Sequence, residues 1–153
     1  MASITRGEAT SPRRIRPAAA PDTDDLAKLL LRLVLGGLLL LHGIAKLQGG
    51  IDPILGAVAR AGLPSGFAYL VYVGELAAPL LLIVGVWTRA AALIVVVNML
   101  VAVALVHSAD LATLSRSGGW ALELQAFYLA TALVVALLGA GRYSVDGGTT
   151  DGR

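Results

Sequence analysis

Hydrophobic residues gather in four long runs, which short polar or glycine-rich segments separate. The runs cover about 26–47, 67–86, 90–107 and 119–138. A helix needs about 20 apolar residues to cross a hydrocarbon core of about 30 Å, and each run has nearly that length or more. The pattern therefore predicts an all-α protein, a transmembrane four-helix bundle.

The segments around the runs predict how the chain is divided. Residues 1–25 are polar and rich in Pro, Arg and Asp, which is typical of a disordered arm. Residues 26–146 form the predicted membrane domain, and 147–153 form a polar tail. An amphipathic stretch at 52–60 is too short to span the membrane, so we expect it at the membrane interface. Only about three residues separate the second and third runs, which predicts a tight antiparallel hairpin.

The distribution of positive charge predicts the orientation of the bundle, because cytoplasmic loops carry an excess of Lys and Arg. Of the 12 basic residues, five lie in the first 28 positions: Arg6, Arg13, Arg14, Arg16 and Lys28. The turn at Arg89 and the tail at Arg142 fall on the same side, so both termini are predicted to be cytoplasmic. A basic arm that binds nucleic acid usually accompanies a soluble reader fold, so no nucleic-acid partner is expected.

Composition agrees with a membrane protein and removes several kinds of chemistry. The chain is 57% hydrophobic and 14% charged, whereas soluble domains carry about 25% charged residues. The lipid bilayer is therefore the first predicted partner. The chain has no cysteine, so it can neither form a disulfide nor hold an iron–sulfur cluster through thiolates. We predict no metal site, and any thiol chemistry must belong to a partner.

Polar side chains inside the runs are the candidate functional residues. An ionisable group in hydrocarbon costs roughly 2.5–3.5 kcal/mol on insertion scales, so such residues usually face the bundle interior and often mark function. The candidates are Arg32, His42, Lys46, Glu75, Asn98, His107, Glu123 and Gln125. With a rise of about 1.5 Å per residue, most of them fall in the half of the bundle opposite the termini. This outer half is the predicted functional region.

Three of these residues are expected to converge. His42 and Lys46 are four residues apart, so they share one face of the first helix. Because Cβ bonds tilt toward the N-terminus of a helix, side chains of these antiparallel helices lean toward one another, and Glu75 can reach both. Pro79 lies four residues after Glu75 and removes the hydrogen bond that would have reached the Glu75 carbonyl. A kink is therefore predicted beside the buried carboxylate.

Each candidate also has a purely structural interpretation. Lys46 and Arg32 can extend their charged ends to the membrane interface, and His107 can lie among the lipid headgroups. A carboxylate near the midplane, such as Glu75, must be paired or protonated. An ion pair of Glu75 with Lys46 or His42 would satisfy it without any chemistry.

The chain resembles the DoxX family of four-span bacterial membrane proteins over residues 26–146. The matching stretches follow in order: Leu30-Leu31-Arg32-Leu33, Leu41-His42-Gly43-Ile44-Ala45-Lys46-Leu47, Gly62-Leu63-Pro64, Gly74-Glu75-Leu76, Gly85-Val86-Trp87-Thr88-Arg89, Asn98-Met99-Leu100-Val101-Ala102, Val106-His107, Gly118-Gly119-Trp120-Ala121-Leu122-Glu123 and Gly139-Ala140-Gly141-Arg142-Tyr143-Ser144-Val145-Asp146. The resemblance implies a multi-pass protein of the bacterial inner (plasma) membrane that is linked to oxidoreductase complexes.

The resulting hypothesis is a membrane subunit of a quinone-linked oxidoreductase that acts in redox or thiol stress or in sulfur-compound oxidation. A soluble or membrane partner would supply the electrons. Glu75 and His42 would exchange protons in this hypothesis. The residues predicted to bind the quinone are His42, Lys46, Glu75, Asn98, His107 and Glu123.

Other hypotheses stay open at this stage, and so does the question of whether the chain is an enzyme. The polar residues could hold a membrane scaffold or anchor together, with Asn98 as an interhelical hydrogen bonder. His42 and His107 could ligate a haem from two helices, which we consider a minor alternative. A small-solute transporter is the other minor alternative, and it would require a homo-oligomer to form a path.

Overall fold

A computed structural model describes residues 23–116 and 118–149. The predicted all-α class is confirmed, and the only β-type pairing among these residues is an isolated bridge between Leu114 and Trp120. The elements in chain order are α1 (Thr23–Gly49), α2 (Asp52–Arg60), η1 (Ser65–Tyr69), α3 (Leu70–Tyr72), η2 (Val73–Ala77), α4 (Ala78–Val84), α5 (Thr88–Val106), η3 (Ser108–Asp110), α6 (Glu123–Leu138) and η4 (Asp146–Thr149).

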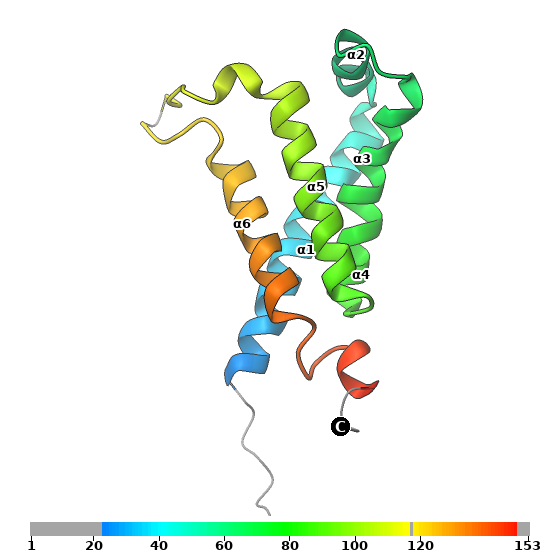
Figure 1. Cartoon of the computed structure of the whole chain (residues 1–153), viewed down its shortest axis with the longest axis vertical. Helices are drawn as coiled ribbons and strands as arrows, with labels where there is room; N and C mark the ends of the chain where they lie inside the picture. Colours follow the sequence, from blue (N-terminus) through cyan, green and yellow to red (C-terminus); the bar gives the residue numbers. More distant parts are fainter. Residues whose placement is uncertain (1–22, 117, 150–153) are drawn as a thin grey trace, which may run out of the picture.

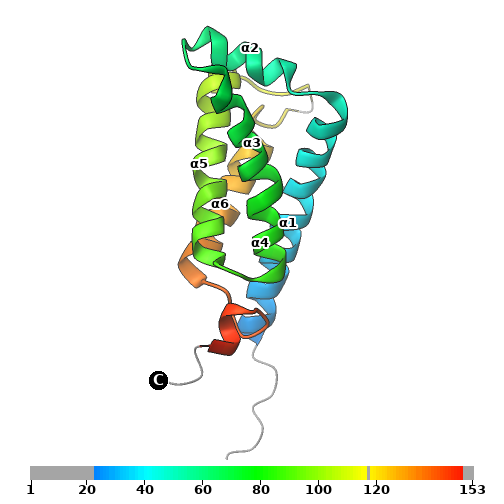
Figure 2. The ribbon, with the colours of Figure 1, turned by 90° about the vertical axis from the view of Figure 1, so that its right-hand side faces the viewer.

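The long helices form a bundle in which α1 and α5 each contact both α4 and α6. Figures 1 and 2 show that the start of α1 and the segment after α6 lie at one end of this bundle, which we call the terminal end. The opposite end, which we call the far end, carries α2 and the loop before α6. Small and branched apolar side chains fill the core between the helices: Leu35, Leu39, Leu82, Ala91, Val95 and Ala132 are almost fully buried.

Three helical segments are long and apolar enough to cross a membrane: Thr23–Gly49, Ser65–Val84 and Thr88–Val106. The fourth apolar helix, α6, is shorter, with 16 residues. Large hydrophobic side chains cover the outer surface of the bundle, and Leu41, Phe127 and Leu137 are 64%, 71% and 78% exposed. Such a surface suits lipid rather than water. The chain is therefore a multi-pass helical membrane protein.

The fourth helix begins later than the sequence predicted, at Glu123 rather than at residue 119. The preceding residues form a compact loop, in which the Ser115 amide donates to the Gly119 carbonyl at 2.7 Å and the Ala121 amide donates to the Thr113 carbonyl at 3.1 Å. The amide of Trp120 donates to the Glu123 side chain at 2.9 Å. These bonds satisfy the backbone in the loop and at the start of α6, so the helix does not extend toward residue 119.

The remaining boundaries agree closely with the prediction. The amphipathic stretch 52–60 is α2, and Figure 2 shows it lying across the far end of the bundle. Of the predicted arm, residues 23–25 form the first turn of α1 and the rest lies outside the described residues. Of the predicted polar tail, residues up to Thr149 belong to η4, and 150–153 lie outside the described residues.

The predicted kink in the second span is a π-helical turn. Helix α3 passes into the π-helix η2, in which the Ala78 amide donates to the Val73 carbonyl five residues earlier. Pro79 follows at the start of α4, where its missing N–H cannot complete the regular helical pattern around Glu75. Such π-turns occur mostly as single insertions and are frequent at functional sites. Glu75 lies inside this turn and is 4% exposed.

Two glycines of α1 allow the kinked span to approach closely. A Cβ atom at Gly43 would overlap the Glu75 carbonyl oxygen, and one at Gly36 would lie 2.9 Å from the Pro79 carbonyl oxygen. The two positions are seven residues apart, so both lie on the face of α1 that contacts η2 and α4. The absence of side chains there brings Glu75 within reach of polar groups on α1.

Candidate functional site

The most buried carboxylate of the described bundle, Glu75, joins three helical segments. Its Oε1 atom forms an ion pair with Lys46 Nζ from α1. The same oxygen accepts a long hydrogen bond of 3.5 Å from Asn98 Nδ2 of α5. Asn98 reaches it because Gly74 has no side chain, and a Cβ atom there would overlap the Asn98 side chain. The predicted approach of Glu75 to Lys46 is observed, whereas Asn98 is the third partner in place of the expected His42. We call Lys46, Glu75 and Asn98 the Glu75 cluster.

The two charged side chains of the cluster differ in their exposed fraction. The Glu75 side chain is 5% exposed, whereas the Lys46 side chain is 33% exposed. The second carboxylate oxygen of Glu75, Oε2, is buried and has no hydrogen-bond partner among the described residues. A buried carboxylate normally has partners for its oxygens, because an unpaired one loses the hydration it had in water. Oε2 can therefore accept a proton or a hydrogen bond from a bound molecule.

Tyr128 of α6 extends the cluster, and sequence reasoning missed it. The rings of His42 and Tyr128 make an edge contact, with centroids 5.8 Å apart and planes at 82°. Tyr128 is 8% exposed and interacts electrostatically with Glu75. The sequence did hold a signal for Tyr128, because this tyrosine lies in the middle of an apolar span, one turn after Gln125. A buried tyrosine hydroxyl needs a polar neighbour, so Tyr128 could have been expected near other polar side chains. His42 is exposed, and no hydrogen bond or ion pair joins it to Glu75 within the described residues. The predicted convergence of His42 with Glu75 is therefore not observed.

His107 belongs to a separate polar group at the far end. Its Nδ1 atom lies 3.2 Å from Asp110 Oδ2, and its Nε2 atom lies 3.2 Å from the Gln125 side-chain nitrogen. Both ring nitrogens are thus already engaged. Gln125 and Tyr128 are three residues apart on α6 and share a face, so the His107 group lies about one helical turn from the contact of Tyr128 with His42.

Glu123 is not brought to the Glu75 cluster. It is exposed at the start of α6, and its carboxylate accepts the Trp120 amide. A carboxylate in the first turn of a helix also interacts favourably with the positive end of the helix dipole. The geometry gives Glu123 a local capping role, although the sequence placed it among the residues that bind a quinone.

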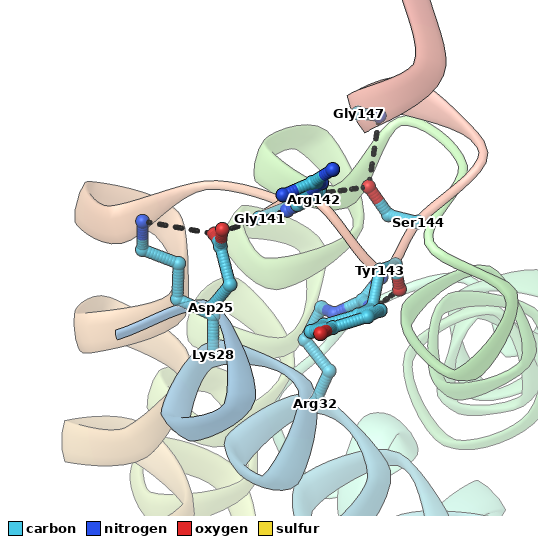
Figure 3. Close-up of polar contacts among 8 residues, drawn as sticks. All are labelled: Asp25, Lys28, Arg32, Gly141, Arg142, Tyr143, Ser144 and Gly147. Carbon is cyan, nitrogen blue, oxygen red and sulfur yellow. Dashed lines mark hydrogen bonds and ion pairs between the residues drawn. The ribbon is translucent and has the colours of Figure 1, made fainter. Parts of the chain in front are cut away.

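Arg32 is fully buried at the terminal end, so its side chain does not extend to the membrane interface. Figure 3 shows it rising from α1 toward Tyr143, whose carbonyl oxygen accepts a hydrogen bond of 2.5 Å from Nη2. Tyr143 lies on the segment 139–149, which we call the C-terminal strap. The strap is also tied to the α4–α5 turn, since the Asp146 amide donates to the Gly85 carbonyl at 3.0 Å. The Asp146 carboxylate accepts the Thr88 amide at 3.1 Å.

Replacing Arg32 by methionine should loosen the C-terminal strap. The variant keeps an apolar stem but loses the charged donor to Tyr143, a type of bond worth about 1.5–3 kcal/mol. Exchange of the Asp146 and Gly147 amide hydrogens should accelerate by about tenfold or more. Arg60→Met, which replaces an exposed basic residue at the far end, is the control and should leave this exchange unchanged. Equal exchange in wild type and Arg32→Met would show that Arg32 does not hold the strap.

The fold and the Glu75 cluster together define a multi-pass helical membrane protein with a buried, ion-paired carboxylate between its helices. The family model named DoxX matches residues 27–108, which is more than half of the chain. The protein therefore belongs to the DoxX family, whose members are membrane proteins associated with oxidoreductase and stress functions. No curated protein and no solved structure shows a significant match to the chain.

Proposed function

We propose that the protein is the membrane subunit of a quinone-linked oxidoreductase and that the Glu75 cluster recognises the quinone headgroup. The observation that supports this most strongly is the buried, unpartnered Oε2 atom of Glu75 beside an oxygen that already holds Lys46 and Asn98. A quinone has two carbonyl oxygens that accept hydrogen bonds and take up protons on reduction, so it needs donors and a proton-exchanging group together. The cluster supplies both from one position.

Each residue of the cluster has a distinct part in this proposal. Lys46 and Asn98 are the hydrogen-bond donors, and Glu75 holds or releases a proton at Oε2. The partly exposed Lys46 links the buried carboxylate to the far-end surface, where protons can enter. Tyr128 and His42 form one wall in this proposal, because their rings pack edge to face and Tyr128 interacts electrostatically with Glu75. The quinone supplies the electron-accepting chemistry when bound, and the electrons come from a partner protein.

The orientation follows from charge and is part of the proposal. We infer that the terminal end faces the cytoplasm of a bacterial cell and that the chain lies in the inner membrane. The described part of this end carries Lys28, Arg32, Arg89 and Arg142, and the far end carries Lys46, Arg60 and Arg116. The excess that the positive-inside rule uses comes from the four further arginines in residues 1–22 of the sequence. The Glu75 cluster then lies in the outer half of the membrane.

A non-catalytic scaffold is the second candidate, and one observation favours it. The ion pair between Lys46 and Glu75 satisfies the main charges of the cluster without a ligand. Neither of the two described cavities is lined by Glu75, His42 or Lys46. In this case the cluster would fix how α1, η2 and α5 pack, and a partner complex would carry all the chemistry. A bis-histidine haem is less well supported, because Asp110 and Gln125 engage both ring nitrogens of His107.

Quinone content of the purified protein distinguishes these functions. We expect wild-type protein, extracted gently with native lipids, to carry about one quinone per chain. Glu75→Gln should lose at least about nine-tenths of it, because the proton-exchanging carboxylate becomes an amide. Glu123→Gln is the matched control, since it changes an exposed carboxylate outside the cluster in the same way, and it should retain the quinone.

Three results would contradict the quinone assignment to the Glu75 cluster. Well-folded wild-type protein with no extractable quinone, and no uptake of added short-chain quinone, would overturn the proposal and favour the scaffold. Equal loss in Glu75→Gln and Glu123→Gln would remove the assignment to the cluster. A visible absorption spectrum recorded on the same samples tests haem, whose Soret band would contradict the quinone assignment.

A further inference from the structure

A second feature lies at the terminal end, far from the Glu75 cluster. An open cleft of about 960 Å³ lies between the α4–α5 turn, the end of α6 and the C-terminal strap, and its lining includes Trp87, Arg89, Leu138, Gly139 and Arg142. Ligand-binding clefts have volumes of about 300–1,000 Å³. The cleft is therefore large enough for a small organic headgroup, and the proposed quinone site does not use it.

The two arginines that line the cleft have exposed side chains. Within the described residues, the guanidinium groups of Arg89 and Arg142 have neither a hydrogen-bond partner nor an ion-pair partner. Arg89 lies beside Gly139, where an added Cβ atom would be 3.1 Å from Nε. Gly139 has a φ of +79°, which favours glycine at the end of α6. The absence of a side chain at Gly139 thus leaves room for the Arg89 guanidinium at the mouth of the cleft.

The two carboxylates that line the cleft already have other partners. Asp25 accepts the Arg142 amide at 3.0 Å and lies 3.6 Å from Lys28 Nζ, as Figure 3 shows. Asp146 accepts the amide and hydroxyl of Thr88 at 3.1 and 3.4 Å. These contacts use hydrogen-bonding capacity of both carboxylates within the protein, whereas the guanidinium groups of Arg89 and Arg142 keep donors that can face a ligand in the cleft.

One side of the cleft is apolar and continues onto the lipid-facing surface. Trp87 is 73% exposed and has a φ of +47°, so it projects from the turn between α4 and α5. Leu138 and Ala90 complete this side, and both lie on helices whose outer faces carry exposed apolar side chains. Exposed tryptophans of membrane proteins concentrate at the boundary between hydrocarbon and water. The cleft therefore has two guanidinium groups on one side and an apolar wall on the other, at the depth where hydrocarbon meets water.

We infer that this cleft binds the phosphate headgroup of an anionic phospholipid, with Arg89 and Arg142 on the phosphate and Trp87 and Leu138 against the acyl chains. Basic pockets between transmembrane helices are a recurrent means of binding anionic lipid. The arginines suit this ligand because the planar guanidinium group can form two parallel hydrogen bonds with phosphate oxygens. The occupant is a lipid rather than a soluble anion, because only a lipid also covers the apolar wall.

Titration of the delipidated protein, followed by native mass spectrometry, tests this inference. Phosphatidylglycerol should bind at least about tenfold more tightly than phosphatidylcholine. The double substitution Arg89→Gln and Arg142→Gln should weaken phosphatidylglycerol binding by about 25-fold, since each basic residue near a membrane surface contributes a factor of about five. The matched control, Arg60→Gln with Arg116→Gln, removes two exposed arginines from the far end and should bind like wild type.

Three outcomes would overturn the inference. Equal affinity for the two phospholipids would show no selectivity for the anionic headgroup. Competition of phosphatidylglycerol by millimolar inorganic phosphate, with no added effect of the acyl chains, would identify a soluble-anion site. Equal weakening in the control pair would assign the effect to total charge. The single substitutions are measured as well, so that a folding defect in one variant does not decide the result.

Discussion

Replacement of Lys46 by methionine is expected to lower the free energy of unfolding by about 3 kcal/mol, because breaking one partner of a buried ion pair leaves the other without compensation. Glu75 is only 5% exposed on its side chain, so solvent cannot replace the lost ammonium group. The expected value is at the lower end for buried pairs because Lys46 itself is 33% exposed. Reversible unfolding in mixed micelles measures this change.

A double-mutant cycle identifies the cause of this loss. Adding Glu75→Gln to Lys46→Met replaces the uncompensated carboxylate with a neutral group of similar shape, so at least half of the lost stability should return. Lys28→Met is the control, because Lys28 pairs with Asp25 at 3.6 Å near the surface and such pairs contribute about 0–1 kcal/mol. If the two losses simply add, Lys46 and Glu75 do not act as a pair.

Alanine substitutions at two glycines of α1 should have opposite effects on stability. At Gly43 an added Cβ atom would overlap the backbone oxygen of Glu75, and the neighbouring Leu76 Cδ2 would lie only 2.6 Å away. Because a backbone carbonyl cannot move aside cheaply, Gly43→Ala should cost about 3 kcal/mol. At Gly37 no atom lies within 4 Å of the added Cβ. There the higher helix propensity of alanine should increase stability by about 0.5–1 kcal/mol.

The same unfolding measurement tests this pair, and the sign of each effect matters. A neutral or stabilising Gly43→Ala would mean that α1 does not pack closely on the π-turn. A large loss at Gly37 would mean that this residue contacts another helix or a second protein. Quinone content is measured on Gly43→Ala in parallel, because displacing α1 also separates Lys46 from Glu75.

The fold could largely be predicted because the physical requirement is simple. A run of apolar residues long enough to cross the bilayer must satisfy its backbone within itself, so length and hydropathy locate the helices. Pro79 likewise predicted the irregular turn, because a missing N–H has only local consequences. The start of α6 was placed too early, since the residues from Gly119 to Leu122 are as apolar as a helix end but bond within the preceding loop.

That Glu75 needs a partner could also be predicted, since a carboxylate deep in an apolar span must be paired. The sequence left Lys46 and His42 as alternatives, and only Lys46 forms the ion pair. The role of Tyr128 could not be predicted, because its burial depends on how α6 is rotated against α1, and α6 has no strong polar face to fix that rotation. The burial of Arg32 could not be predicted either, and the sequence allowed its side chain to extend to the membrane interface. Its burial depends on the C-terminal strap, and Tyr143 is more than a hundred positions away in the sequence.

The most direct test of the quinone assignment is photolabelling of the wild-type protein in lipid nanodiscs with a photoreactive short-chain quinone. The proposed site predicts label on peptides that contain Lys46, Glu75 or Tyr128, displaced by excess natural quinone and strongly reduced in Glu75→Gln. Label confined to the outer surface of α6 near Phe127, or label that excess quinone does not displace, would contradict a quinone site at the Glu75 cluster.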